Sequence, residues 1–297
     1  MKAISIAILG TGPLADLIAK RIEARKDLHL AGVVVSTEKP PSDSACVIYL
    51  PSATEQEAGS SAARITELLR AGFNVVSTLP AEALPRADIL AACKEGKSSF
   101  HGSGGFQSSL ISRFNRAFAS ITRNIRDVEL IEERDVEDGG LPTSDKAQSA
   151  EAGAYYEAGL NLLSEAVFGE GKVGGDITRS ALRTQAPASA RLSPHKTPAA
   201  EQLCVCRTLG EHVSYDSVWT QRTGNSAPLR YRFNTRSSDA LGYVSIDFHA
   251  GNGASPTDHL AASGLLDAVH AVQESAPGIL RHDLDIWQVK ADDRFQR

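Results

Sequence analysis

The sequence lacks the features that mark two large classes of protein. No apolar run approaches the roughly 20 residues that a membrane-spanning helix needs. Basic residues are not in excess, because 31 lysines and arginines stand against 36 aspartates and glutamates, giving a formal net charge of −5. This balance argues against a nucleic-acid-binding protein, which would carry a basic face. We therefore expect neither a membrane nor a nucleic acid as a partner.

Cysteine is scarce as well, with four in 297 residues. Cys46 falls in an apolar strand and Cys93 in a predicted helix, while Cys204 and Cys206 share one face of a predicted strand. These spacings match no site of paired Cys/His ligands, so we expect reduced structural thiols and no metal. Cleavage of a signal peptide would destroy the motif at Gly10-Thr11-Gly12, so we expect a cytoplasmic protein.

The sequence does contain a dinucleotide-binding motif near its start. An apolar strand over residues 4–9 runs into Gly10-Thr11-Gly12-Pro13-Leu14-Ala15 and then into an apolar-periodic helix. In this G-x-G-x-x-[GA] arrangement the first glycine permits the tight turn and the second lets a pyrophosphate approach the backbone at the helix N-terminus. A strand–turn–helix that uses glycines without a ligand is the alternative. The residues predicted to bind the cofactor here are Gly10, Thr11, Gly12, Pro13 and Leu14.

The end of the second predicted strand, Leu28–Val35, bears on the choice between NAD and NADP. We expect this valine-rich strand to be covered on both faces of a parallel sheet. An acidic residue after it would bind the ribose hydroxyls of NAD. Ser36, Thr37 and Lys39 instead offer hydroxyl and ammonium groups to a 2′-phosphate, although Glu38 could bind a ribose. We therefore predict that Ser36, Thr37 and Lys39 bind NADP, with NAD as the alternative.

The order of predicted elements divides the chain in two. Strand and helix alternate five times up to residue 124, which predicts a doubly wound parallel sheet. After it come an acidic strand, a long helix, an irregular connection over residues 178–200, several strands with short linkers and a final helix over about 257–275. We predict an α/β protein, a Rossmann doubly wound parallel sheet plus a smaller α+β domain with a mixed or antiparallel sheet. The predicted domains are residues 1–124, with 276–297 packing back on them, and residues 125–275.

Five stretches, in this order and spacing, resemble the dihydrodipicolinate-reductase-like superfamily, with the 2,4-diaminopentanoate dehydrogenase and native amine dehydrogenase branch as the most similar. They are Ala7–Gly12, Val47–Ser52, Leu69–Thr78, His101–Gly104 and Ala268–Ile279, followed by His282-Asp283-Leu284. The resemblance implies hydride transfer between NAD(P)H and a C=N carbon. It also implies that the second domain binds substrate and forms a homodimer. Cofactor contacts implied in the same way are Leu50, Pro51 and Ser52, with Thr78, Gly102 and Ser103 near the nicotinamide.

The sequence departs from that superfamily in two places. The segment Leu130–Val136 is acidic and has neither the His-His pair nor the lysine of true dihydrodipicolinate reductases, so we exclude the lysine-biosynthesis substrate. Phe106-Gln107-Ser108 stands where the most similar branch usually has Asn-Pro-Gly. A phenylalanine beside the nicotinamide favours a hydrophobic or aromatic substrate.

Imine reduction needs a proton donor to nitrogen, and two residues near the carboxyl ends of strands are candidate catalytic groups. Glu82 follows the fourth strand, and its alternative role is a dipole partner in the first turn of the next helix. His101 ends the fifth strand, and its alternative role is that of a packed strand-end histidine.

Three further groups of residues have open interpretations. Glu133 and Asp135 share a strand face, which points either to the cleft or to solvent. The pair Tyr155-Tyr156 could donate a proton or pack in the core. Arg230 and Arg232 could hold a substrate carboxylate or form cross-strand ion pairs.

We therefore predict an NAD(P)H-dependent oxidoreductase that transfers a hydride to or from the C=N carbon of a small, apolar or aromatic substrate, as an imine reductase or an amine-dehydrogenase-like enzyme. The alternative is a Rossmann protein without redox turnover, either a cofactor sensor or a non-redox biosynthetic enzyme. An alcohol or sugar dehydrogenase is disfavoured, because Leu79-Pro80 replaces the Lys-Pro motif expected after the fourth strand.

Overall fold

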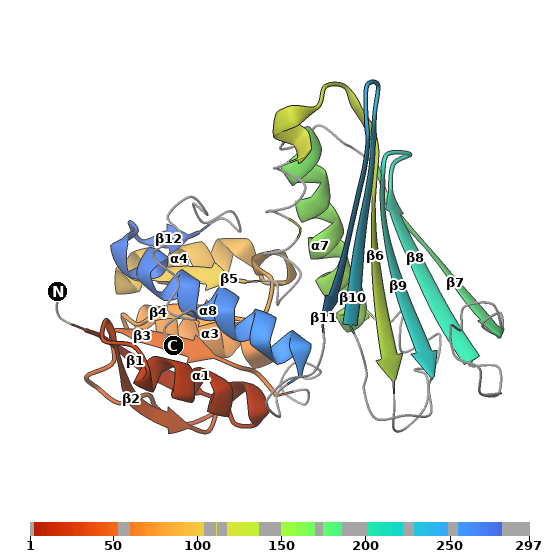
Figure 1. Cartoon of the computed structure of the whole chain (residues 1–297). Helices are drawn as coiled ribbons and strands as arrows, with labels where there is room; N and C mark the ends of the chain where they lie inside the picture. The colour runs from red at the N-terminus through yellow and green to blue at the C-terminus, as the bar shows by residue number, and fades with distance from the viewer. Residues whose placement is uncertain are drawn as a thin grey trace.

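The computed structural model consists of two sheets standing side by side, each with its own helices (Figure 1). It describes residues 3–52, 60–103, 111, 118–136, 150–169, 175–185, 201–221, 229–248 and 255–280. Phe106, Gln107 and Ser108 lie outside this set. Across the described ranges, no helix is long and apolar enough to cross a membrane.

The first sheet is the predicted doubly wound parallel sheet. Its strands are β1 (Ile4–Leu9), β2 (Leu28–Val34), β3 (Cys46–Tyr49), β4 (Asn74–Ser77), β5 (Ser99–Gly102) and β12 (Gly278–Ile279), in the order β12-β5-β4-β3-β1-β2. Every neighbouring pair is parallel. Because β2 lies on one side of β1 and β3 on the other, the strand order reverses next to β1. Open α/β sheets bind their ligands outside the strand ends at such a point.

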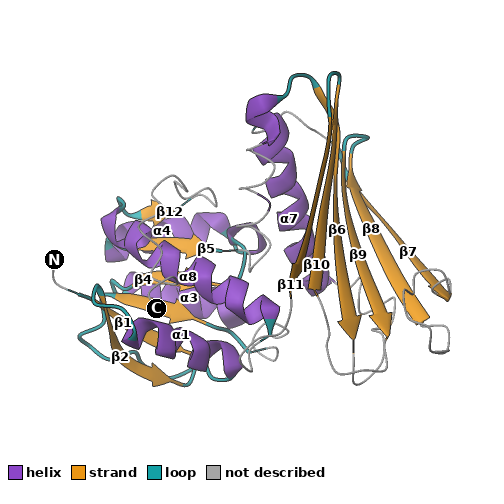
Figure 2. Ribbon diagram, in the orientation of Figure 1, coloured by secondary structure: helices purple, strands orange, loops and turns teal. Residues whose placement is uncertain are grey.

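Helices cover both faces of this sheet (Figure 2). They are α1 (Pro13–Glu23), α3 (Ser60–Arg70), α4 (Arg86–Gly96) and α8 (Pro256–Glu274). Successive side chains of a strand point to opposite faces, so Ile6 and Ile8 of β1 pack with α1 and α8, whereas Ala7 and Leu9 pack with α3 and α4. This double cover explains why β3 and residues Ile6–Leu9 of β1 are apolar throughout.

Most of helix α8 packs on the first sheet, although Leu260 and Ala261 near its start contact the core of the second. The predicted final helix is present, but Leu265, Val269 and Val272 on it share a core with Ile6 and Ile8. The predicted range 125–275 put this helix in the second domain. Its sequence could not reveal the error, because an amphipathic helix carries no label for the sheet that it covers. The remainder of the domain division stays a prediction.

Strand β2 differs from the prediction that both of its faces are covered. It is the edge strand of the first sheet, and Val33 and Val35 are 43% and 50% exposed. A run of valines favours any strand through its branched side chains. The composition therefore indicated a strand without indicating whether it lies at the centre or at the edge.

The second sheet is mixed, as predicted. Its strands are β6 (Ile125–Val136), β7 (Ile177–Gln185), β8 (Glu201–Leu209), β9 (Val213–Gln221), β10 (Leu229–Ser237) and β11 (Leu241–Phe248), in the order β11-β10-β6-β9-β8-β7. The pair β6 and β9 is parallel, and the other neighbours are antiparallel. Helix α7 (Ala150–Phe168) covers the face that is turned towards the first sheet (Figure 1). We call this the inner face and the opposite one the open face.

Strand β7 corrects the prediction of an irregular connection over residues 178–200 for its first part, residues 178–185, whereas residues 186–200 lie outside the described set. Residues 177–185 pair with β8 along their whole length, from Ile177 with Leu209 to Gln185 with Glu201. The strand lies at the edge of the sheet, where even the apolar side chain of Leu182 is exposed, and this position accounts for its polar composition. Pairing with a neighbour that lies distant in the sequence therefore outweighed weak local propensity.

The four cysteines are free thiols, as predicted. Burial raises the pKa of the Cys46 thiol to about 12 and that of Cys93 to about 11. Both thiols therefore stay protonated near neutral pH, which fits structural cysteines.

A partly exposed carboxylate, that of Asp27, connects α8 to the first sheet. Asp27, just before β2, lies 2.6 Å from the guanidinium of Arg25 and 2.7 Å from Nε2 of His270 on α8. The hydrogen bond from Arg25 holds the pKa of the Asp27 carboxyl well below its usual range.

Replacing Asp27 by Asn should therefore lower the free energy of unfolding at pH 7 by about 0.5–1 kcal/mol, the range for partly exposed pairs. A depressed pKa stabilises the folded state at pH values above about 3.9, where Asp in the unfolded chain is ionised, and this contribution disappears on acidification. Urea unfolding of wild type and Asp27→Asn from pH 7 to pH 3 should show the difference shrinking below pH 4. The exposed Asp43→Asn serves as control. A difference that does not change with pH would contradict this account.

Candidate functional site

The residues predicted to bind a dinucleotide gather on one edge of the first sheet, since the carboxyl ends of parallel strands meet there. In strand order they follow β5 (Gly102 and Ser103), β4 (Thr78), β3 (Leu50 to Ser52), β1 (Gly10 to Leu14) and β2 (Ser36 to Lys39). This edge faces the second sheet. Leu14 packs against the inner-face core of that sheet, and the short 3₁₀ turn η1 (Ala81–Ala83) contacts α7.

Gly10 is required by a close approach between two strand ends. Its N–H donates to the carbonyl of Val34 at 2.9 Å, and its φ is +132°. A Cβ built at Gly10 would lie 2.4 Å from the carbonyl oxygen of Leu50. The first glycine of the motif therefore makes the turn and lets β1 and β3 end side by side.

Gly12 has a different environment. Its φ is +113°, and it occupies the N-cap of α1, with Pro13 at the first helical position. A Cβ at Gly12 would meet no atom of the described chain within 4 Å. Open space in front of a helix N-terminus is what an approaching phosphate needs. The packing of the chain thus requires a glycine at position 10, whereas Gly12 leaves room for a ligand.

The loops after β4 and β5 support each other at the other end of this edge. A Cβ at Gly102 would lie 2.4 Å from the carbonyl oxygen of Leu79. The N–H of Ser103 donates to the carbonyl of Ser77 at 2.8 Å, and the N–H of Leu79 donates to Oγ of Ser77 at 3.3 Å. Thr78 is therefore held between two fixed strand ends.

The structure places the two candidate catalytic residues in different settings. His101 lies within β5 opposite Val76 and is 3% exposed, which suits the packed strand-end histidine better than a donor that exchanges with solvent. Glu82 belongs to η1, at the junction with α7, and α4 begins only at Arg86. Glu82 is therefore not in the first turn of α4, and the alternative role as its dipole partner is removed. The Glu82 side chain lies outside the described part of the structure.

Glu133 and Asp135 point to the open face, so their interpretation as groups facing the cleft is wrong. The Glu133 carboxylate pairs with the guanidinium of Arg232 and, at 3.5 Å, with that of Arg230, which also binds Asp247 at 2.5 Å. The arginines of β10 therefore form cross-strand ion pairs, as the more cautious interpretation predicted.

Glu132, one position earlier, faces inward and was missed. Its carboxylate is fully buried and accepts hydrogen bonds from the hydroxyls of Tyr231 at 2.7 Å and Tyr215 at 2.9 Å, and from Nε of Arg134 at 2.5 Å. A buried charge is costly unless it is paired in this way. The alternation Val128-x-Leu130-x-Glu132 was the signal that could have revealed it, because the first two residues are core residues.

A second cation, this one fully buried, lies near this carboxylate. Arg207 on β8 is fully buried; its guanidinium carbon lies 4.1 Å from the centre of the Tyr156 ring, and Nη1 donates to Oγ of Ser217 at 3.2 Å. Burial lowers the pKa of Arg207, and it raises the pKa of Tyr156 to about 12. We call Glu132, Arg134, Arg207, Tyr215 and Tyr231 the inner-face polar centre.

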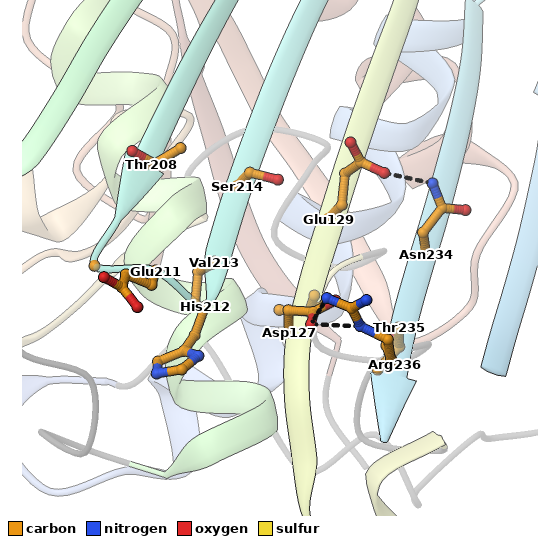
Figure 3. Close-up of a pocket in the computed structure, with 12 residues that line it drawn as sticks. Asp127, Glu129, Thr208, Glu211, His212, Val213, Ser214, Asn234, Thr235 and Arg236 are labelled. Carbon is orange, nitrogen blue, oxygen red and sulfur yellow. Dashed lines mark hydrogen bonds and ion pairs between the residues drawn. The ribbon is translucent and has the colours of Figure 1, made fainter. Parts of the chain in front are cut away.

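A cavity of about 460 Å³ lies elsewhere, at the open-face end of the second sheet beside the β8–β9 hairpin (Figure 3). Asp127 on its wall pairs with Arg236 at 2.6 Å, and Glu129 accepts a hydrogen bond from Asn234 at 2.6 Å. The cavity and the carboxyl edge of the first sheet lie on opposite sides of the second sheet. The cavity is therefore not part of the dinucleotide site.

Comparison with known proteins shows likeness at the level of fold. The sequence matches no family model and no curated protein. An amine dehydrogenase from Mycobacterium smegmatis superposes with a TM-score of 0.61 and 13% identity, over 93% of this chain and 94% of that one. For a myo-inositol dehydrogenase from Corynebacterium glutamicum these values are 0.52, 13%, 93% and 90%. For a biliverdin reductase from Synechocystis, solved with biliverdin and NADP+, they are 0.50, 10%, 92% and 92%.

The chain therefore has a Rossmann dehydrogenase fold. These three proteins are named as an amine dehydrogenase, a myo-inositol dehydrogenase and a biliverdin reductase. Since the names differ in substrate, the likeness does not single out the dihydrodipicolinate-reductase-like superfamily. At such low identity it transfers the fold alone.

The two motif glycines should respond differently to substitution by Ala. Gly10→Ala should lower the free energy of unfolding by about 3 kcal/mol or more, because strain at positive φ adds to a backbone clash. Gly12→Ala should cost only about 1–2 kcal/mol but abolish dinucleotide binding. Thermal unfolding with and without NADPH measures both effects.

Gly264→Ala is the matched control, because this helical glycine also has open space around its Cα. It should retain stability and the NADPH-induced shift. If Gly12→Ala keeps the shift seen in wild type, Gly12 does not contact the phosphates.

Proposed function

We propose that this chain is an NAD(P)H-dependent oxidoreductase that transfers a hydride to or from a C=N carbon. The observation that carries the proposal is Gly12, a positive-φ glycine at a helix N-terminus with open space in front of it, at the reversal point of a parallel sheet. The shared fold with an amine dehydrogenase, a polyol dehydrogenase and an NADP-dependent reductase supports it.

The order of the strands gives the dinucleotide a direction. Its pyrophosphate would lie on Gly10 to Leu14, its adenosine ribose beside Ser36, Thr37 and Lys39 after β2, and its nicotinamide beside Thr78, Gly102 and Ser103. Leu50, Pro51 and Ser52 would line the centre. Thr37 and Lys39 are exposed, whereas Ser36 is 7% exposed. We favour NADP, since an exposed hydroxyl and an exposed ammonium suit a 2′-phosphate.

The bound cofactor supplies the hydride, and the chain must orient the substrate and move a proton. We propose Glu82 as the residue that gives a proton to the substrate nitrogen. Its backbone lies in η1 between the loop after β5 and helix α7, so it stands where the carboxyl edge of the first sheet meets the second. His101, buried in β5, then supports the strand end next to the nicotinamide.

The inner face of the second sheet would form the opposite wall of the substrate site. Trp219 of β9 lies partly buried on this face, with its ring centre 6.1 Å from that of the buried Tyr156 of α7, and it favours an apolar or aromatic substrate. The inner-face polar centre would hold these rings in place.

We also propose that the protein is a homodimer formed through the open face. Leu241 and Tyr243 on β11 are 82% and 65% exposed beside the charged ladder of β6 and β10, and a second copy would cover them.

The first experiment is a parallel fluorescence titration of the purified protein with NADPH and NADH, followed by turnover with imines and with ketone–amine mixtures. Oxidation of NADPH that depends on an imine would support the proposal. Binding of both cofactor forms without any turnover would instead support a cofactor sensor. Failure to bind either nucleotide would remove the redox function.

Glu82→Gln should lower kcat for imine reduction by about 10²- to 10⁴-fold, because an amide keeps the shape but cannot donate the proton. Cofactor affinity should stay unchanged, since Glu82 is not assigned a cofactor contact. Steady-state kinetics from pH 5 to pH 9 test this, with the exposed Glu95→Gln as control. A Glu82→Gln enzyme with wild-type kcat would show that the proton comes from another group.

A further inference from the structure

Helix α3 is tied to the turn after β2 by one arginine that the sequence did not single out. Nε of Arg64 donates to the carbonyl oxygen of Ser36 at 3.1 Å, and Nη2 donates to the carbonyl oxygen of Glu38. Nη1 forms an ion pair with Glu67 at 2.7 Å. All three guanidinium nitrogens are thus in use, and the side chain is only 12% exposed.

The turn that Arg64 holds is the one expected to meet the adenosine ribose. It is closed by a hydrogen bond from the N–H of Glu38 to the carbonyl of Val35 at 2.9 Å. The bonds from Arg64 hold the carbonyls of Ser36 and Glu38 in the same turn. The backbone over residues 35–38 is therefore held twice, while the side chains of Thr37 and Lys39 stay exposed.

Arg64 also changes the charge at this place. Two carbonyl oxygens and the Glu38 carboxylate would otherwise present negative charge beside a 2′-phosphate. The Arg64 guanidinium, which also pairs with Glu67, binds both carbonyls and so offsets the negative potential of these two oxygens. Its planar fork can reach two acceptors at once, which an ammonium cannot do as rigidly.

The other arginine of the same helix provides a contrast. Arg70 makes an ion pair with Glu95 at 3.2 Å, with both side chains more than half exposed. Such a pair contributes little to stability or shape. Arg64 differs because its side chain is only 12% exposed and because two of its three nitrogens bind backbone carbonyls of a distant turn.

From this geometry we propose that Arg64 is a positioning residue for the adenosine end of the dinucleotide, and that it sets the preference for a 2′-phosphorylated ribose by holding the turn that carries Thr37 and Lys39. The inference rests on the proposed function, in that the carboxyl edge of the first sheet binds a nicotinamide dinucleotide.

The test compares Arg64→Met, Arg64→Lys and the control Arg70→Met with wild type, by calorimetric titration with NADPH, NADH, adenosine 2′,5′-bisphosphate and AMP. Arg64→Met should weaken NADPH and the bisphosphate by about tenfold or more, in line with the loss of charge-assisted hydrogen bonds. NADH and AMP should change by less than about threefold, a difference close to the precision of such comparisons. Arg64→Lys should fall between wild type and Arg64→Met, and Arg70→Met should match wild type.

The outcomes separate this inference from the function on which it rests. Equal weakening of NADPH and NADH by Arg64→Met would overturn the role in preference, and so would unchanged NADPH binding. If Arg64→Met does not fold, Arg64→Lys decides in the same way, because it keeps the charge and the stem. A wild-type protein that prefers NADH would overturn the inference but leave dinucleotide binding intact. Wild type that binds none of the four probes would overturn the proposed function itself.

Discussion

The end of β1 touches the end of β3, and the site at the carboxyl edge depends on that contact. A Cβ atom at position 10 would lie only 2.4 Å from the carbonyl oxygen of Leu50, so only a residue without a side chain fits there. Because Gly10 takes this position, the chain turns at once and α1 starts with its N–H groups in front of the strand ends. The loops after β2, β4 and β5 then extend the same edge on either side. A bulkier residue at Gly10 would move β3 away and separate these loops.

The first sheet could be predicted because its signals are local. The strand, the two glycines and the helix stand within about twenty residues, and each following strand is marked by an apolar run and a turn. The errors in that prediction concerned which elements pack against each other, and not which elements form. Nothing in Leu28–Val34 shows that β2 is the edge strand, and nothing in Pro256–Glu274 names the sheet that α8 covers. Both facts depend on contacts between residues far apart in the sequence.

The sequence predicted a mixed or antiparallel second sheet, but it did not predict which side chains point to each face of that sheet. A strand exposes alternate residues, so an error of one position reverses the assignment of every side chain. The acidic run of β6 drew attention to Glu133 and Asp135 on the open face, where Glu133 pairs with Arg232, and away from Glu132, which is buried. Arg207, Tyr215 and Tyr231 come from other strands and Tyr156 from helix α7, and no spacing in the sequence relates them to Glu132. The tie from Arg64 to Ser36 was hidden for the same reason, since 28 residues separate its ends.

The position of α8 has a consequence for the order in which the protein is built. Ala262, Leu265, Leu266, Ala268, Val269 and Val272 supply a large part of one core layer of the first sheet, yet they follow the whole second sheet in the chain. A ribosome releases the N-terminal half before these residues exist. The apolar face of the newly made sheet that carries Ile6, Ile8 and Ile48 is therefore covered by α1 alone during most of synthesis, and this core layer is completed only when α8 packs on it.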